Sequence, residues 1–367
     1  MRGWLLVPIA LVAATLVVLP AAALTETGVE VDVKEALGFH PDACAAPTNL
    51  ASPWTEGPPL AYKRDEPRVA VIGGEAYLVG GATSLLEEED GELLVDPSDA
   101  LTRFDPRTDE YTELAPLPRP LNHVGVAAYR GDLYVLGGYG RHVTSHTSKH
   151  FYRYDPATDR WSRLPDLPRP RAAMAVGVIG DRLYVAGGAR DRIPLNETYA
   201  YDFRSRRWLR LANMHSRREH VGEAMLDGKL YVLGGRVPGS LAVDTAERYD
   251  PATDRWERLA PMPVPVGGLA AVEEGGKVIA VAGGNDEAGT VTGAVQEFDP
   301  ASGEWSRLPD LRTARHGHGV AVIDDRIWVF GGSDCAYFNA TDKVESLHLD
   351  RLGRPDGEQL SPSGGAS

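Results

Sequence analysis

The 367-residue sequence is 43% hydrophobic and 25% charged, a balance that excludes wholesale disorder. Its two cysteines exclude a disulfide-dense small scaffold and a zinc site built from three or four thiolates. The excess of 52 Asp and Glu over 38 Lys and Arg gives a net charge of −14, which argues against a nucleic-acid-binding surface. The 40 glycines and 27 prolines indicate many turns.

Residues 1–23 have the pattern of a secretory signal peptide. Arg2 precedes an apolar run from Trp4 to Leu19, and three alanines that end at Ala23 follow it. A positive start, an apolar middle and a small-residue exit predict cleavage near Ala23 and a secreted or periplasmic location. The alternative is an uncleaved membrane anchor, because the apolar stretch is about long enough to span a bilayer. Residues 24–50 are expected to form an N-terminal extension.

A repeat of roughly fifty residues organises residues 51–350. In each of six copies a Gly-Gly pair closes an apolar run, and a turn and a second apolar run precede it, which predicts a hairpin. Downstream, an Asp ends a third run and an aromatic residue follows six positions later. The Gly-Gly pairs are Gly80-Gly81, Gly137-Gly138, Gly187-Gly188, Gly234-Gly235, Gly283-Gly284 and Gly331-Gly332. The Asp–aromatic pairs are Asp105/Tyr111, Asp155/Trp161, Asp202/Trp208, Asp250/Trp256 and Asp299/Trp305.

Each repeat is predicted to form four antiparallel strands joined by short turns. A single such sheet cannot bury both of its faces, whereas copies stacked around an axis cover one another. The order of strand, Gly-Gly, Tyr-Asp-Pro, a six-residue spacing to Trp, then Leu-Pro and Arg resembles the kelch repeat from Trp54 to about Asp350. The resemblance implies an all-β fold, a six-bladed kelch-type β-propeller with four-stranded antiparallel blades.

The two ends of the repeat region are predicted to close the ring. Trp54 stands ten residues before Arg64, as the fourth-strand aromatics of other repeats stand before their arginines, but no Asp precedes it by six. The sixth repeat has a third strand that ends at Asp350 and no aromatic after it. We therefore expect the strand at Trp54 to complete the last blade, which removes the exposed sheet edges.

Cys44 and Cys335 fall beside this closure, because one precedes the closing strand and the other lies in a loop of the last blade. In an oxidising compartment a Cys44–Cys335 disulfide would join the two ends. The alternative is two unrelated thiols. Residues 351–367 have no core-forming content and are expected to be a flexible C-terminal tail.

One face of the predicted disc gathers arginine and histidine. The start of the first strand and the end of the second lie at one edge of a hairpin, so residues sixteen and fourteen before each Gly-Gly pair share a face with those after it. Arginine binds carboxylate, sulfate or phosphate in a fork, which favours an anionic ligand. The alternative is that the arginines sixteen residues before the pairs serve inter-blade hydrogen bonding. The candidate ligand-binding residues are Arg64, His123, Arg141, His142, Arg171, Arg190, Arg218, His220, Arg236, Arg315 and His316.

The sequence predicts no metal, no cofactor and no catalytic residue. His142, His146 and His150 are spaced by four, which would align metal ligands on a helix but has no such meaning in the loop expected here. An acidic insertion at residues 85–99 is expected to overhang the Arg/His-rich face as a solvated loop.

An enzyme is the alternative function. The periplasmic sialic acid (N-acetylneuraminate) epimerases are six-bladed kelch-like proteins with a signal peptide, and their anionic sugar would suit this face, but no catalytic motif matches. Arg218, Glu219 and His220 together offer groups for proton transfer. A copper site like that of galactose oxidase does not fit, because neither cysteine has a recognisable Tyr-His setting. We expect instead a monomeric binding module for a protein partner or an anionic carbohydrate or peptide, with pure scaffolding as a third possibility.

Overall fold

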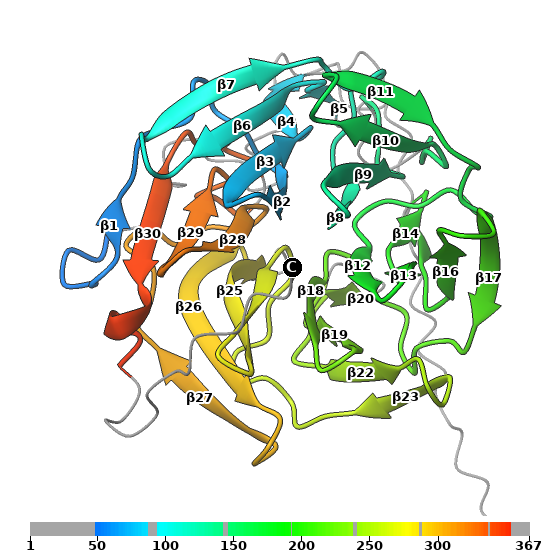
Figure 1. Cartoon of the computed structure of the whole chain (residues 1–367). Coiled ribbons are helices and arrows are strands. Elements are labelled where there is room, and N and C mark those ends of the chain that lie inside the picture. The colour runs from blue at the N-terminus through cyan, green and yellow to red at the C-terminus, as the bar shows by residue number, and fades with distance from the viewer. Residues whose placement is uncertain are drawn as a thin grey trace, which may run out of the picture. The chain divides into compact units, whose positions relative to one another are not determined.

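The computed structural model describes residues 48–86, 94–141, 146–191, 193–237, 241–285, 288–336 and 338–353. Within the compact unit 44–367, six four-stranded antiparallel sheets surround a central axis (Figure 1), which confirms the predicted six-bladed β-propeller. The predicted signal peptide, nearly all of the N-terminal extension and residues 354–367 of the tail lie outside the described residues. In the part of the chain that is described, no helix is long and apolar enough to cross a membrane.

Each of the first five blades consists of strands taken in chain order from the axis outward. Blade 1 contains β2 (Arg68–Ile72), β3 (Glu75–Val79), β6 (Leu101–Asp105) and β7 (Glu110–Leu114). Blade 2 contains β8 (Gly125–Tyr129), β9 (Asp132–Leu136), β10 (Phe151–Asp155) and β11 (Arg160–Arg163). Blade 3 contains β12 (Ala175–Ile179), β13 (Arg182–Ala186), β16 (Thr198–Asp202) and β17 (Arg207–Leu211).

The remaining blades follow the same order, except that the outermost strand of blade 6 comes from the other end of the chain. Blade 4 contains β18 (Gly222–Leu226), β19 (Lys229–Leu233), β22 (Ala246–Asp250) and β23 (Arg255–Arg258). Blade 5 contains β24 (Ala270–Glu274), β25 (Lys277–Asn285), β26 (Thr290–Asp299) and β27 (Glu304–Leu308). Blade 6 contains β28 (Gly319–Ile323), β29 (Arg326–Phe330), β30 (Val344–His348) and β1 (Thr55–Glu56), and the 3-10 helix η2 (Leu349–Arg351) follows β30.

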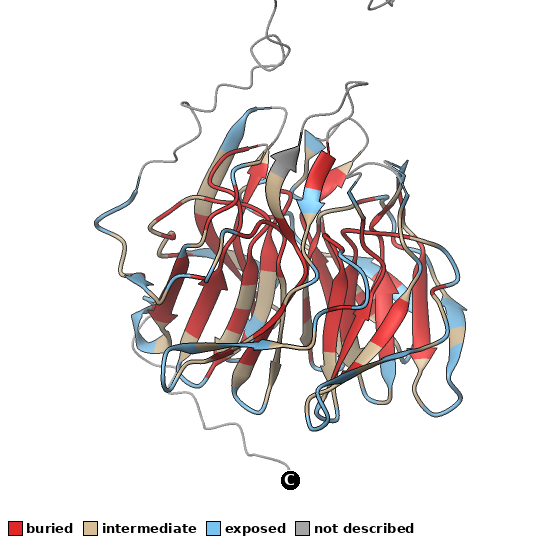
Figure 2. Cartoon of the chain, turned by 90° about the horizontal axis from the view of Figure 1, so that it is seen from above, coloured by how far each residue is buried: buried red, intermediate tan, exposed pale blue. Residues whose placement is uncertain are grey.

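The hydrophobic core lies between neighbouring blades. One cluster joins Tyr77 and Val79 of blade 1 to Val124, Val135 and Tyr154 of blade 2. Figure 2 shows this burial running through the disc, with exposed residues concentrated at the turns. Every blade covers its sheet faces with its neighbours, as the repeat pattern predicts.

The six-residue spacing from Asp to Trp has a physical cause. After Asp155 the chain makes a tight turn in which the Asp155 carboxylate accepts from the Ala157 amide (3.0 Å). The turn brings Trp161 against blade 1, where its indole donates to the carbonyl of Ala115 (2.8 Å). Trp208, Trp256 and Trp305 each donate in the same way to a backbone carbonyl of the preceding blade. The spacing therefore joins each blade to the one before it.

The ring closes through β1, as predicted. β1 pairs antiparallel with β30, with Thr55 opposite Ser346 and Glu56 opposite Glu345. The buried Trp54 donates its indole N–H to the carbonyl of Pro309 (2.9 Å) and thereby joins blade 6 to blade 5. Cys44 lies outside the described residues, so its disulfide with the buried Cys335 stays a prediction.

Short hairpins extend four of the blades on the face that carries the residues after the Gly-Gly pairs, here called the loop face. Blade 5 does so by lengthening β25 and β26. The other three hairpins are β4 (Ala82–Leu86) with β5 (Leu94–Pro97), β14 (Ala189–Arg190) with β15 (Ile193–Pro194), and β20 (Arg236–Val237) with β21 (Leu241–Ala242). The acidic insertion predicted at 85–99 is thus partly a strand pair, and its residues 87–93 lie outside the described residues.

Truncation of the closing tryptophan should destabilise the whole ring. We expect Trp54→Ala to lower the free energy of unfolding by about 3–5 kcal/mol, because a large buried side chain and an inter-blade hydrogen bond are both lost. Trp54→Phe keeps most of the packing and should lose about 1–2 kcal/mol. Urea unfolding followed by tryptophan fluorescence measures both. An alanine variant as stable as the wild type would contradict closure by this strand.

Candidate functional site

Four of the predicted ligand-binding arginines lie inside the blades. Arg64, Arg171, Arg218 and Arg315 are at most 2% exposed. In blade 4, Arg218 donates to the carbonyls of Gly234 (2.6 Å) and Thr245 (2.8 Å) and pairs with the Glu247 carboxylate (3.0 Å). The side chain therefore joins the end of the second strand to the third strand of the same blade.

The same arrangement recurs in blades 3 and 6. Arg171 donates to the carbonyl of Gly187 (3.0 Å) and pairs with Glu197 (3.1 Å). Arg315 donates to the carbonyl of Gly331 (3.2 Å) and pairs with Glu345. In the four blades that carry an arginine at this position, its side chain forms hydrogen bonds within its own blade. The inter-blade hydrogen bonds come from the tryptophans instead.

A ring of backbone hydrogen bonds surrounds the central channel near the loop face. It is formed by one residue per blade in the left-handed conformation, with φ between 51° and 63°. At five of the six junctions the amide of one member donates to the carbonyl of the preceding member, at 2.7–3.0 Å. The six members are Glu66, His123, Ala173, His220, Gly268 and Gly317.

Blade 5 departs from the residue count by one position. Fourteen residues before its Gly-Gly pair is Leu269, but the ring member is Gly268. A bulge in β25 between Val281 and Gly283 inserts one residue. The positions that precede the Gly-Gly pair in this blade are therefore one residue further from it than in the other blades.

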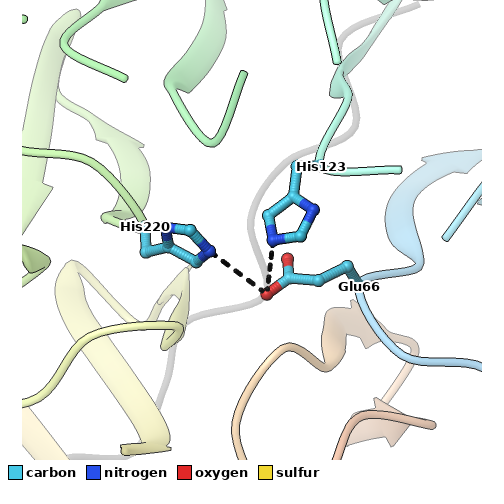
Figure 3. A group of neighbouring side chains, drawn as sticks. All are labelled: Glu66, His123 and His220. Carbon is cyan, nitrogen blue, oxygen red and sulfur yellow. Dashed lines mark ion pairs between the residues drawn. The ribbon is translucent and has the colours of Figure 1, made fainter. Parts of the chain in front are cut away.

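Three ring members bring polar side chains together at the channel mouth (Figure 3). Nε2 of His123 lies 3.4 Å from Oε1 of Glu66, and Nε2 of His220 lies 3.9 Å from the same oxygen. The two imidazole rings meet edge to face with centroids 4.6 Å apart. Side chains from blades 1, 2 and 4 therefore meet at the Glu66 carboxylate.

Two further predicted residues line this mouth. Arg236 is buried beside Glu219, with which its backbone forms an isolated bridge, and its side-chain stem lies against Gly267. His316 is buried against Gly268 of the ring. Of the remaining predicted residues, Arg141 is exposed and Arg190 is half-buried, and His142 lies outside the described residues.

Comparison with known proteins agrees with this architecture. The family model described as the KLHDC2/KLHL20/DRC7 Kelch-repeats domain matches residues 122–332, more than half of the chain. This chain belongs to the kelch-repeat family. The match begins within the second blade and covers the mouth residues His123 and His220.

Curated kelch proteins are similar over shorter stretches. Kelch-like protein terF of Aspergillus terreus is 32% identical over 102 residues, which cover 26% of this chain and 21% of that protein. Kelch-like ECH-associated protein 1A of Danio rerio is 36% identical over 80 residues, 22% of this chain and 11% of that protein. Kelch-like protein 36 of Bos taurus is 30% identical over 87 residues, 23% of this chain and 13% of that protein. The matches thus span about a fifth or less of each relative.

The mouth of this kelch propeller holds an ionised carboxylate beside a neutral imidazole at neutral pH. Burial raises the pKa of Glu66, but the positive charges that His123, His220 and Arg68 can carry outweigh burial and bring that pKa to about 2. Burial lowers the pKa of His123 to about 4 and that of His316 to about 3. At neutral pH His123 and His316 are therefore uncharged, and each imidazole has one nitrogen with a free lone pair.

A cavity of about 50 Å³ lies between the innermost strands of five blades. Arg68 reaches Glu223 there (3.5 Å) and also donates to the carbonyl of Val124 (3.3 Å). Burial raises the pKa of Glu223 to about 7, although Arg68 opposes the rise. Glu223 is therefore a channel carboxyl that changes charge near neutral pH.

The kelch pattern did not reveal every channel residue. Glu66 occupies the same position in its repeat as His123 and His220 do in theirs, but a search for cationic residues passes over it. The sequence presents Glu219 only as part of a possible proton-transfer triplet with Arg218 and His220. The structure separates that triplet, because Arg218 points into its blade while Glu219 bonds His220.

Replacement of a buried arginine should lower the stability of the fold. We expect Arg218→Met to lower the free energy of unfolding by about 3–5 kcal/mol, because the buried Glu247 loses its guanidinium partner and keeps, among the described residues, only His215 and Ser216 as side-chain partners. Urea unfolding of Arg218→Met, Glu247→Leu and the double variant checks this, and the double variant should recover most of the loss. Independent, additive losses would contradict the pairing.

The channel carboxyl Glu223 should make stability depend on pH. An unfolded glutamate ionises near pH 4.3, so the stability that protonated Glu223 contributes is complete below that pH and is lost as pH rises through about 7. The total loss is about 4 kcal/mol. We expect Glu223→Gln to gain stability relative to the wild type between pH 5 and pH 8, as measured by urea unfolding. The exposed Glu113→Gln serves as the control, and a parallel response of both variants would refute the assignment.

Proposed function

We propose that this kelch propeller is a binding module that recognises a protein partner through its loop face. The observation that carries the proposal is a pair of exposed apolar side chains at the hairpin tips of neighbouring blades. Ile193 of β15 in blade 3 is 50% exposed and Leu241 of β21 in blade 4 is 40% exposed. Loops on a rigid scaffold commonly carry the recognition surface, and exposed apolar side chains on these loops support contact with another protein.

The charge on this face supports an acidic contact on the partner. Arg190 pairs across its hairpin with Ile193, so a cation and an apolar side chain belong to the same tip. Arg141, in the loop that follows β9, is exposed. The four arginines inside the blades take no part in this proposal, because their guanidinium groups have partners there. An acidic segment of a protein fits the mixed surface better than a small sugar, since the apolar tips also need covering.

A location outside the cytoplasm is a further part of the proposal. It rests on the signal-peptide pattern of residues 1–23 and on the predicted Cys44–Cys335 disulfide, which needs an oxidising compartment. Mass measurement after alkylation without reduction tests the disulfide, since the bonded protein takes up no alkylating reagent.

A photo-crosslinking amino acid placed at Ile193 identifies the partner, and the same substitution at Leu209 serves as the matched control. Leu209 is 38% exposed on the outermost strand β17 of the same blade, away from the loop face. We expect crosslinks from position 193 that position 209 does not give. Ile193→Asp with Leu241→Asp should then weaken binding of that partner at least tenfold, while Leu209→Asp leaves its affinity unchanged. Equal loss in both variants would contradict a loop-face site.

A further inference from the structure

The mouth of the channel places three metal-ligand side chains on one rigid ring. Glu66, His123 and His220 come from three different blades, and one ligand atom from each lies within 4.8 Å of the others. All three side chains are about 11% exposed, so they face the channel rather than open solvent. Figure 3 shows both imidazoles directed at the carboxylate.

Hydrogen bonds on the far side of each ring fix the imidazole tautomers. The Asn122 amide donates through Nδ2 to the carbonyl of Gly140 (2.8 Å), which leaves its Oδ1 to accept from Nδ1 of His123 (2.5 Å). The Glu219 carboxylate can only accept, and it lies 2.5 Å from Nδ1 of His220. Both histidines therefore carry a proton on Nδ1, and in the neutral form their Nε2 atoms carry lone pairs.

Those lone pairs point at an acceptor. Both Nε2 atoms face Oε1 of Glu66, so three electron-rich atoms converge with no hydrogen between them in this tautomer. A cation between them removes the repulsion. A shared proton would draw nitrogen and oxygen to about 2.7–2.9 Å. The observed 3.4 Å is instead close to the edge of a tetrahedron around a metal with bonds of about 2.0–2.1 Å, roughly 3.3 Å, and the 3.9 Å separation would shorten when His220 coordinates the ion.

We propose that Glu66, His123 and His220 bind a divalent transition-metal ion of the zinc class at the channel mouth. Two imidazole nitrogens and one carboxylate oxygen are a donor set that zinc and related ions accept, and three protein ligands leave a further coordination position open. Asn122 and Glu219 act as the outer partners that orient metal-bound imidazoles. The inference is independent of the loop-face function.

Backbone geometry prepares this site before any ion arrives. The three residues have φ of 51–54°, a conformation in which the equivalent positions of blades 5 and 6 carry glycine. Glycine adopts this conformation without strain, whereas glutamate and histidine adopt it at a cost in backbone strain. The backbone ring holds these α-carbons in fixed positions, so the donor atoms converge without a flexible loop having to close.

Nearby charges set the affinity. Glu219 adds a second carboxylate behind His220, while Arg236 and Arg68 bring positive charge to the same channel and His316 flanks it. Arg236 opposes a bound cation, so Arg236→Gln should bind the metal several-fold more tightly than the wild type. A site for an anion would respond in the opposite direction.

Titration of the EDTA-treated full chain with ZnCl₂ in a calorimeter tests the proposal, with Co²⁺ absorption as a report on coordination. We expect one metal ion per chain, visible Co²⁺ bands of a tetrahedral site, and a zinc-dependent rise in the melting temperature. Glu66→Gln, which keeps the shape of the side chain, and His123→Ala should each weaken binding more than tenfold and abolish the Co²⁺ bands.

Two histidines outside the channel provide matched controls. His348→Asn alters a surface imidazole that faces Asp325 and Asp350, and His150→Gln removes one of the three loop histidines spaced by four. Both should bind zinc like the wild type. Zinc binding that survives Glu66→Gln and His123→Ala, or that is lost in His150→Gln, would overturn the proposal, as would a folded wild-type chain that binds no zinc.

Discussion

A propeller blade is stable only when neighbouring blades cover both faces of its sheet, so the fold depends on closure of the ring. Here β1 closes it by pairing with β30, and Trp54 joins blade 6 to blade 5 with the same indole-to-carbonyl bond that the fourth-strand tryptophans of blades 2 to 5 make. β1 itself pairs two residues, and the segment around it adds backbone bonds from Asn49 to Arg312 and from Gly57 to Val344. The buried indole adds a side-chain hydrogen bond to these backbone contacts.

Three of the blades are stabilised internally by charged side chains of a kind that most folds keep at the surface. Arg171, Arg218 and Arg315 are fully buried, and each combines backbone carbonyls with one carboxylate. Burial of such a pair has a large desolvation cost, which hydrogen bonds to the carbonyls and the carboxylate offset, although Nε of Arg171 and of Arg315 has no hydrogen-bond partner among the described residues. The gain is a rigid connection between the Gly-Gly end of the second strand and the third strand. That rigidity fixes where the loop-face hairpins and the ring residues lie.

The channel mouth shows what this rigidity permits. Glu66, His123 and His220 belong to different blades and are far apart in sequence, yet their donor atoms meet because each α-carbon lies on the hydrogen-bonded ring. A site built in this way needs no loop to fold over its ligand. The loop face differs in kind, because its hairpins project from the blades and carry exposed apolar tips. One molecule thus offers a preorganised polar centre and a broader surface suited to a protein.

The repeat pattern made the architecture predictable, down to the number of blades and the origin of the closing strand. Periodic Gly-Gly pairs and the Asp-to-Trp spacing act within about fifty residues, so they can be read locally. The candidate site was predictable only in part. Counting back from the Gly-Gly pairs placed His123 and His220 at the mouth, but it left open whether Arg171 and Arg218 bind a ligand or serve hydrogen bonding, and it missed the bulge that moves the count in blade 5.

The sequence by itself thus determined the blade, since turn residues and strand periodicity specify hydrogen bonds between neighbours in the chain. Only the tertiary structure decided which polar side chains face the channel and which face a blade interior. Arg218 and His220 are two residues apart, and one is a buried tie while the other lines the mouth. Spacing cannot separate those roles, because they depend on a left-handed backbone turn and on partners supplied by other strands and other blades.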